Sequence, residues 1–237
     1  MRNPLNHFAR LDSLDFPVFE PASVWLVGAG PGAPGLLSLL AYHGLGQADV
    51  IVYDALVNPK ILDMATPEAE KIYAGKRGGR PSAKQANISL TLIEKAKEGK
   101  KVLRLKGGDP FMFGRGGEEC LALADAGIEF RIVPGITAGI GGLAYAGIPV
   151  THRETNHAVI FLTGHGENGS VPQSVDWHCL ATAAPVIVMY MALKHLRSIC
   201  TKLITAGRDP KDRLAIVSNA SLPGQSVFET TLAQAAN

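Results

Sequence analysis

Apolar and polar positions alternate along the first part of the chain in a way that predicts strands separated by helices. Short apolar runs are typical of buried strands, and longer amphipathic stretches between them are typical of helices. Strands are predicted at residues 24–27, 50–53, 71–74, 102–105 and 130–133. Helices are predicted at residues 36–47, 84–98 (with Ser82 as N-cap) and 116–126. This alternation favours an α/β fold with a largely parallel sheet.

The pattern changes after "VPGITAG", residues 133–139, where small residues dominate as far as "AGIPVTHRE". Beyond this stretch, β-branched strands are predicted in "HAVIFLTG", "APVIVMY" and residues 215–218, with a helix at 193–205 and a final strand running into a helix in "QSVFETTLAQ". We therefore predict a flexible tail over residues 1–21, an N-terminal α/β domain over 22–134 and a C-terminal α/β domain over 135–237. The second domain is expected to lack its last strand, because the chain stops soon after that final strand.

Composition fits an ordinary globular protein and narrows the classes of partner. The 237 residues are 46% hydrophobic and 19% charged, and the formal net charge of +2 is too small to indicate nucleic acid. The exception is "GKRGGR", residues 75–80, a local basic cluster without interleaved aromatic residues. No apolar run reaches the roughly 18 residues of a membrane span, and the N-terminus has no apolar signal core. The expected location is the cytoplasm.

The sequence offers no metal site and none of the common hydrolase signatures. Cys120, Cys179 and Cys200 have no C-x-x-C spacing, so they are expected to be buried thiols in a reducing compartment. No H-E-x-x-H, G-x-S-x-G or Walker lysine pattern is present.

A glycine-rich turn follows the first predicted strand and raises the question of a nucleotide site. The stretch "VGAGPGAPG" fits the dinucleotide pattern G-x-G-x-x-G/A at Gly28, Gly30 and Ala33. Asp54, which ends the next strand, has the spacing of a ribose-binding carboxylate. However, Pro31 and Pro34 each remove one N–H from the turn, which weakens it as a phosphate cradle. A tight turn without a ligand is the alternative, and both interpretations stay open on this motif alone.

A second glycine cluster, "RLKGGDPFMFGRGGEE" at residues 104–119, carries more chemistry. Gly107 and Gly108 permit close backbone approach, and Asp109 can accept a hydrogen bond from an amine or hydroxyl. Met112 and its flanking phenylalanines offer apolar contact for a ring or a thioether. The alternative is a long loop leading into a helix whose first turn carries Glu118 beside a second glutamate.

Taken together, the motifs resemble those of the tetrapyrrole methylases, which depend on S-adenosylmethionine, and among them the uroporphyrinogen-III C-methyltransferases. They occur in the family's order: "VGAGPG", "YDALV", "AGKRGG", "RLKGGDPFMFGRGGEE", "VPGITAG", "GIPVTHR", "LTGH" and "VMYMA". The similarity spans residues 23–232. It implies two α/β domains with the cofactor cleft between them, not a Rossmann fold, and a homodimer that needs no metal.

The resemblance also implies roles for individual residues. Positions matching the family's contacts to S-adenosylmethionine, and to its product S-adenosylhomocysteine, are Pro31, Gly107, Gly108, Asp109, Met112, Thr137, Ala138, Met191 and Ala220. Asp54 matches a proposed proton acceptor and Lys76 a proposed proton donor. Arg115 and Glu118 match positions proposed to engage the macrocycle or to aid proton removal.

The expected substrate, uroporphyrinogen III, carries many carboxylates and calls for a cationic rim. The rim candidates are Lys76, Arg77, Lys106, Arg115, His152 and Arg153. The chain departs from the family at Ala55, where many members have arginine. The expected reaction is methylation at C2 and C7 to give precorrin-2 via precorrin-1. The alternatives are a related methylase acting on a later corrin intermediate, a dinucleotide-dependent oxidoreductase and a non-catalytic binding protein.

Overall fold

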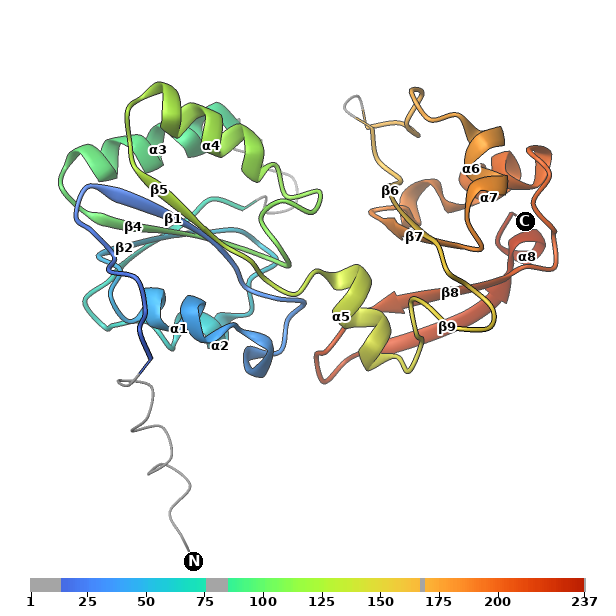
Figure 1. Ribbon diagram of the computed structural model, residues 1–237, viewed down its shortest axis with the longest axis horizontal. Helices are drawn as coiled ribbons and strands as arrows, with labels where there is room; N and C mark the ends of the chain where they lie inside the picture. Colours follow the sequence, from blue (N-terminus) through green and yellow to red (C-terminus); the bar gives the residue numbers. More distant parts are fainter. Residues whose placement is uncertain (1–13, 76–84, 167–168, 237) are drawn as a thin grey trace, which may run out of the picture.

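The first half of the chain forms a parallel five-stranded sheet, as the alternating pattern predicts. The structure, a computed structural model, describes residues 14–75, 85–166 and 169–236 (Figure 1). The sheet has the order β3-β2-β4-β1-β5. Its strands are β1 (Ser23–Gly28), β2 (Val50–Tyr53), β3 (Glu70–Tyr73), β4 (Lys101–Lys106) and β5 (Phe130–Val133). Its helices are α1 (Leu39–Leu45), α2 (Pro59–Leu62), α3 (Gln85–Lys97) and α4 (Gly116–Asp125).

Helices cover both faces of this sheet, which explains why its strands read as continuous apolar runs. Figure 1 shows α3 and α4 over one face and α1 and α2 over the other. Successive strand residues alternate between the two faces. Trp25 and Leu103 therefore pack into the core with α1 and α2, whereas Val24 and Val102 pack into the core with α3 and α4.

The strand order differs from that of a dinucleotide-binding Rossmann sheet. In the Rossmann order, 3-2-1-4-5-6, the first strand pairs with the second. Here β1 lies between β4 and β5, and β4 separates it from β2. The loops that follow β1, β4 and β5 therefore leave the same edge of the sheet from adjacent strands. This topology places both glycine clusters next to each other.

The end of the segment predicted as a flexible tail packs against the N-terminal core. Phe19 has no exposed surface and its ring stacks on Trp25, with centroids 4.4 Å apart. Phe16 stacks on His43 at 4.5 Å. Burial of these two aromatic rings orders the segment. Residues 1–13 lie outside the described part of the chain.

The second half of the chain combines helices with smaller sheets than the first half. It comprises α5 (Ala138–Tyr145), β6 (Val159–Thr163), α6 (Trp177–Ala183), β7 (Val186–Tyr190), α7 (Leu196–Thr205), β8 (Arg213–Ser218), β9 (Ser226–Thr231) and α8 (Leu232–Ala236). Among the described residues, β6 and β7 form a parallel pair and β8 and β9 an antiparallel pair, so the strands of this half form two separate two-stranded sheets. Leu180, Ile199, Leu203 and Leu232 form its core.

Local signals explain most differences from the predicted elements. The helix predicted at 36–47 begins only at Leu39, because the Ser38 side chain caps it by accepting a hydrogen bond from Ala41 N at 3.2 Å. The pattern missed α2, α5 and α6. The sequence of α5, AGIGGLAY, is rich in glycine, which disfavours a helix in isolation. Cys200 is buried as expected, but Cys179 is exposed and Cys120 is only partly buried.

Candidate active site

Three loops from adjacent strands meet at one edge of the sheet. Gly30, in the loop after β1, donates from its N to Gly108 O at 3.1 Å, and Gly108 N donates to Gly30 O at 2.8 Å. A Cβ on Gly28 would lie 2.6 Å from both Gly108 O and Gly135 Cα. Only glycine permits such an approach. The two glycine clusters and "VPGIT" therefore form one site.

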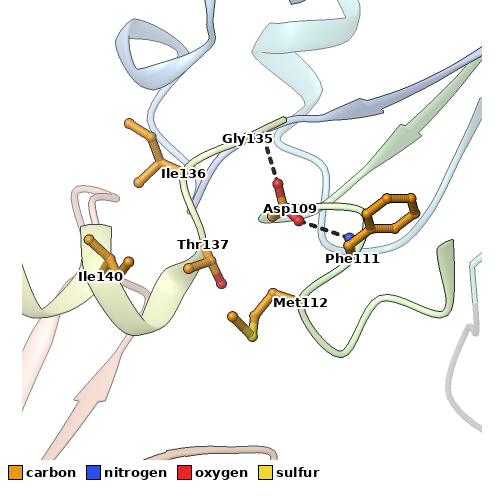
Figure 2. Close-up of a pocket in the computed structure, with 7 residues that line it drawn as sticks. All are labelled: Asp109, Phe111, Met112, Gly135, Ile136, Thr137 and Ile140. Atoms are coloured by element: carbon orange, nitrogen blue, oxygen red, sulfur yellow. Dashed lines mark hydrogen bonds between the residues drawn. The ribbon is translucent and has the colours of Figure 1, made fainter. Parts of the chain in front are cut away.

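Asp109 links the second glycine loop to the loop after β5. Its Oδ1 accepts a hydrogen bond from Phe111 N at 2.8 Å, and its Oδ2 accepts one from Gly135 N at 3.0 Å (Figure 2). Both donors are backbone amides, so the carboxylate fixes the shape of the backbone around it. The sequence predicted Asp109 as an acceptor for a ligand, and the structure assigns its carboxylate a bracing contact as well.

A pocket of about 360 Å³ opens beside this carboxylate. Its lining combines a few polar groups with apolar side chains, as ligand sites usually do. Figure 2 shows the residues that line it, namely Asp109, Phe111, Met112, Gly135, Ile136, Thr137 and Ile140. Three residues predicted to contact the cofactor, Asp109, Met112 and Thr137, are thereby brought to one cavity.

The other predicted cofactor residues lie around this pocket on neighbouring elements. A Cβ on Gly141 would lie 3.1 Å from Pro31 Cγ, and one on Gly142 would lie 2.8 Å from the Ala220 methyl group. Pro31 and Ala220 therefore pack against the same helix, α5, at adjacent positions. Ala138 is the first residue of that helix.

Met191 follows β7 with a left-handed φ of 54° and is 56% exposed. The residue before it, Tyr190, contacts Thr137 through its hydroxyl at 2.7 Å. This hydrogen bond connects the end of β7 with the start of α5. Met191 is not one of the lining residues, but it directly follows Tyr190, whose hydroxyl contacts the lining residue Thr137.

Asp54 lies at the carboxyl end of β2 and is partly buried. Its Oδ1 accepts a hydrogen bond from Leu56 N at 2.9 Å, which forms a turn, and its Oδ2 accepts one from Gly107 N at 3.3 Å. The carboxylate therefore belongs both to the turn after β2 and to the second glycine loop. This location suits a base that acts beside the pocket.

Lys106 is corrected from a rim cation to a buried one. Its Nζ lies 3.0 Å from Glu119 Oε2, and Arg104 Nε donates to Glu119 Oε1 at 3.0 Å. The side chains of Lys106 and Glu119 are 5% and 0% exposed. Burial lowers the pKa of the Lys106 ammonium, as does neighbouring Arg104, while Glu119 opposes the shift. Lys106 thus has no surface to offer to substrate carboxylates.

Arg115 and Glu118, predicted to lie on one helix face, form an ion pair at the start of α4. Arg115 Nε donates to Glu118 Oε1 at 2.9 Å and Arg115 Nη2 to Oε2 at 2.5 Å. This fork lowers the pKa of the Glu118 carboxyl. Both side chains are more than half exposed, so they are accessible to a substrate.

Four more residues were predicted as cations that bind substrate carboxylates. Two of them are exposed, and the other two lie outside the part of the chain that the structure describes. His152 and Arg153 are exposed, and His152 Nδ1 accepts a hydrogen bond from Glu154 N at 3.3 Å. Lys76 and Arg77 lie outside the described residues. The described chain reaches Gly75, where a Cβ would lie 2.5 Å from Ala55 N.

Three residues of the site escaped the sequence analysis as functional positions. Tyr190 contacts Thr137, and Ser221 Oγ accepts a hydrogen bond from Ala33 N at 2.9 Å. Glu119 holds the buried cations described above. The sequence does show tyrosine before Met191 and serine after Ala220, but their partners are 53 and 188 residues away. No local pattern signals contacts at that separation.

The family model of the tetrapyrrole (corrin/porphyrin) methylases matches residues 23–236. The chain is a tetrapyrrole methylase. The match extends over both halves of the fold and includes every loop described above. It confirms the family predicted from the motifs, and it confirms the fold class as distinct from a Rossmann arrangement.

Relatives of this methylase include curated enzymes. It is 63% identical over 219 residues to a uroporphyrinogen-III C-methyltransferase of Sinorhizobium sp., covering 92% of this chain and 78% of the relative. It is 49% identical over 212 residues to the siroheme synthase of Baumannia cicadellinicola, covering 90% of this chain. The chain spans under half of the length of that synthase, at 46%.

Solved structures support the same assignment. The uroporphyrin-III C-methyl transferase of Thermus thermophilus complexed with S-adenyl homocysteine matches with a TM-score of 0.80 and 39% identity, covering 90% of each chain. A cobalt precorrin-4 methyltransferase matches with a TM-score of 0.81 and 26% identity, covering 94% of this chain and 90% of that one. Together these comparisons confirm the predicted methyltransferase activity and its dependence on S-adenosylmethionine.

No helix in the described residues is long and apolar enough to cross a membrane. Within the same part of the chain, no group of three or more His, Cys, Asp or Glu side chains is arranged to hold a metal ion.

Proposed function

We propose that the methylase transfers methyl groups from S-adenosylmethionine to C2 and C7 of uroporphyrinogen III, giving precorrin-2 by way of precorrin-1. The observation that carries this proposal is the convergence of three loops on one pocket, with Asp54 bonded to the loop that also contributes Asp109. The 63% identity to a uroporphyrinogen-III C-methyltransferase supports the same substrate.

The pocket suits the cofactor's mixed chemistry. Met112, Ile136 and Ile140 provide apolar surface for a base or a thioether, and Asp109 and Thr137 add polar atoms. Pro31, Gly107, Gly108, Ala138, Met191 and Ala220 are proposed as further contacts from the surrounding loops. The prolines that disfavour a phosphate cradle are compatible with a sulfonium nucleoside, which carries no phosphate.

The reaction needs alignment and one proton acceptor. The sulfonium methyl is already an activated electrophile, so holding a pyrrole carbon against it can contribute about 7–11 kcal/mol. A C–C bond forms as the C–S bond breaks, and S-adenosylhomocysteine leaves. The methylated ring is then cationic and loses a proton to a base. We propose Asp54 as that base and Lys76 as a proton donor. A proton given to one ring position by Lys76 is matched by a second proton removed from another position, so each cycle adds one methyl group and releases one proton in total.

The substrate's carboxylates require cations at the mouth of the site. We propose Arg115, His152 and Arg153 for this role, together with Lys76 and Arg77. Exposure of the first three supports the assignment. Lys106 is left out because it is buried.

A related methylase acting on a later corrin intermediate is the second candidate. The TM-score of 0.81 to a cobalt precorrin-4 methyltransferase shows that this fold accommodates such a substrate in a relative. The segments "AGKRGG" and "THR" favour uroporphyrinogen III. A panel of both substrates separates the two candidates.

The test is turnover of purified protein with S-adenosylmethionine and uroporphyrinogen III. We expect a dimethylated product and two equivalents of S-adenosylhomocysteine. If the cofactor binds and no product forms, the substrate assignment is wrong. Calorimetric titration with a nicotinamide dinucleotide is the matched control, and binding there in place of S-adenosylhomocysteine would favour an oxidoreductase.

We further propose a homodimer that works in the cytoplasm. Exposed apolar side chains on β9, such as Val227 at 40% and Phe228 at 63%, offer surface for a second copy. The three cysteines are free thiols, which is compatible with a reducing compartment. Sedimentation of the purified chain tests the dimer, and a monomeric mass would contradict it.

A further inference from the structure

The start of α5 is capped by a hydroxyl from another element. The N-cap residue, Thr137, makes no side-chain capping bond of its own. Instead, Gly139 N donates to the hydroxyl of Tyr190, on β7, at 2.8 Å. The first N–H groups of a helix need such an acceptor. Tyr190 therefore fixes the backbone at the point where α5 borders the pocket.

The same tyrosine hydroxyl lies 2.7 Å from Thr137 Oγ1. Each hydroxyl carries one hydrogen and can accept from two donors. Because Gly139 N–H can only donate, the tyrosine oxygen is its acceptor. The contact between the two hydroxyls uses one of their two hydrogens. The second hydrogen has no acceptor among the hydrogen bonds of the described residues.

Thr137 is the member of the pair whose hydroxyl can present this hydrogen to the pocket. Thr137 is 8% exposed and lines the cavity. Figure 2 shows its side chain facing the pocket beside Met112. A buried hydroxyl hydrogen without an acceptor is unfavourable, so an acceptor atom on a ligand bound in the pocket would stabilise this arrangement.

Several contacts hold Tyr190 in this place. Its ring centroid lies 5.0 Å from that of Phe113, which comes from the second glycine loop, and 6.3 Å from that of Phe161 on β6. A side chain larger than hydrogen at Gly139 would collide with the tyrosine hydroxyl. Two aromatic rings and one glycine thus position the hydroxyl. Tyr190 connects β7 to the second glycine loop through Phe113 and to the start of α5 through its hydroxyl.

We propose that Thr137 and Tyr190 act as one hydroxyl pair that donates a hydrogen bond to an oxygen or nitrogen acceptor of bound S-adenosylmethionine. Tyr190 is the positioning residue of the pair, and its role goes beyond the contacts assigned from the family motifs. The inference rests on the cofactor part of the proposed function and is independent of the methyl acceptor.

Calorimetry with S-adenosylhomocysteine tests the pair in the full chain. Tyr190→Phe and Thr137→Val should each weaken binding about tenfold, which corresponds to about 1.4 kcal/mol. The double variant should be no weaker than Thr137→Val, because Tyr190 acts on the cofactor only by positioning the Thr137 hydroxyl, which Thr137→Val removes. Thr137→Ser keeps the hydroxyl and should restore wild-type affinity. In turnover assays, the KM for S-adenosylmethionine should rise in Tyr190→Phe while kcat is retained.

Tyr145→Phe is the matched control, since this tyrosine is at the far end of α5, is 52% exposed and is not among the residues that line the pocket. It should bind S-adenosylhomocysteine as the wild type does. The inference is overturned if Tyr190→Phe loses thermal stability but binds S-adenosylhomocysteine within twofold of the wild type. It is also overturned if the affinity losses of Tyr190→Phe and Thr137→Val add in the double variant. Should Tyr190→Phe not fold, equal affinity of Thr137→Val and Thr137→Ser would overturn it. Failure of the wild type itself to bind would instead refute the proposed function.

Discussion

Asp54 and Gly107 are joined by a hydrogen bond in which Gly107 N donates to Asp54 Oδ2 at 3.3 Å. This bond connects the end of β2 to the loop whose Asp109 lines the pocket. A carboxylate in this position can serve the reacting centre without contributing to the pocket wall. A change at Asp54 should therefore affect turnover more than cofactor affinity, and the two effects can be measured separately.

Asp54→Asn should lower kcat by about 10²- to 10⁴-fold, the range that a general base contributes, while S-adenosylhomocysteine affinity stays within a few fold. The amide oxygen of asparagine can keep one of the two backbone hydrogen bonds, but it cannot accept the proton. Steady-state kinetics and calorimetry on the same preparation make the comparison. Asp63→Asn, at an exposed carboxylate that follows α2, is the control and should be unchanged. Wild-type turnover by Asp54→Asn would remove this residue from the mechanism.

Asp109→Ala should have the opposite profile. Loss of its carboxylate frees Phe111 N and Gly135 N, two donors that now shape opposite walls of the pocket. Hydrogen bonds to a charged group are worth about 1.5–3 kcal/mol, so we expect cofactor affinity to fall at least tenfold. Calorimetry with S-adenosylhomocysteine measures the loss. An affinity equal to that of the wild type would show that the bracing contacts do not shape the cofactor site.

Arg115→Met should raise the pKa of Glu118 towards its ordinary value. The guanidinium is the main cause of the lowered pKa, and Lys106 contributes a smaller part. A carboxyl whose pKa is lowered on folding adds stability above its unfolded pKa, and that stability is lost as the pH falls through the folded value. Titration of Glu118 by carboxyl NMR in both proteins makes the measurement. An unchanged titration would mean that the ion pair does not persist in solution.

The N-terminal sheet was predictable because its signals are local. Each buried strand is a short apolar run, and the strand at Val50–Tyr53 is found with the predicted bounds. The C-terminal half was harder, since α5 contains three glycines that favour a loop by propensity. There, close packing decides: Gly141 and Gly142 leave room for Pro31 and Ala220. Packing of this kind has no signature in the local sequence.

The site was predictable as a set of residues but not as an arrangement. Asp109, Met112 and Thr137 share a pocket, as the motifs imply. Lys106 differs because its exposure depends on a partner 13 positions later in the chain, Glu119, which the helix α4 turns inwards. A lysine in a glycine-rich motif looks exposed in sequence. Only the fold reveals that a buried carboxylate occupies the space beside it.

Glu119→Gln should destabilise the fold by about 3–5 kcal/mol, because it removes the carboxylate that two buried cations share. Lys106→Met should cost less, since Arg104 and Glu119 then remain as a balanced pair. Urea unfolding at pH 7 compares the two variants with the wild type. An equal loss in both would contradict this charge balance within the cluster.

The Lys106 ammonium should also give stability a particular dependence on pH. Its folded pKa is lowered from 10.5, so between the lowered value and 10.5 the unfolded chain binds more protons than the folded one. Stability attributable to this group therefore rises with pH across that window. Lys95 is the matched opposite, because its bond to Glu70 raises its pKa and the associated stability is lost as the pH rises through that value. Urea unfolding from pH 7 to 10.5 should show that Lys106→Met removes a rising contribution. The falling contribution that Lys95→Met removes should appear only when the series is continued above pH 10.5. Parallel curves for the wild type and Lys106→Met would show that the buried lysine titrates as a free one does.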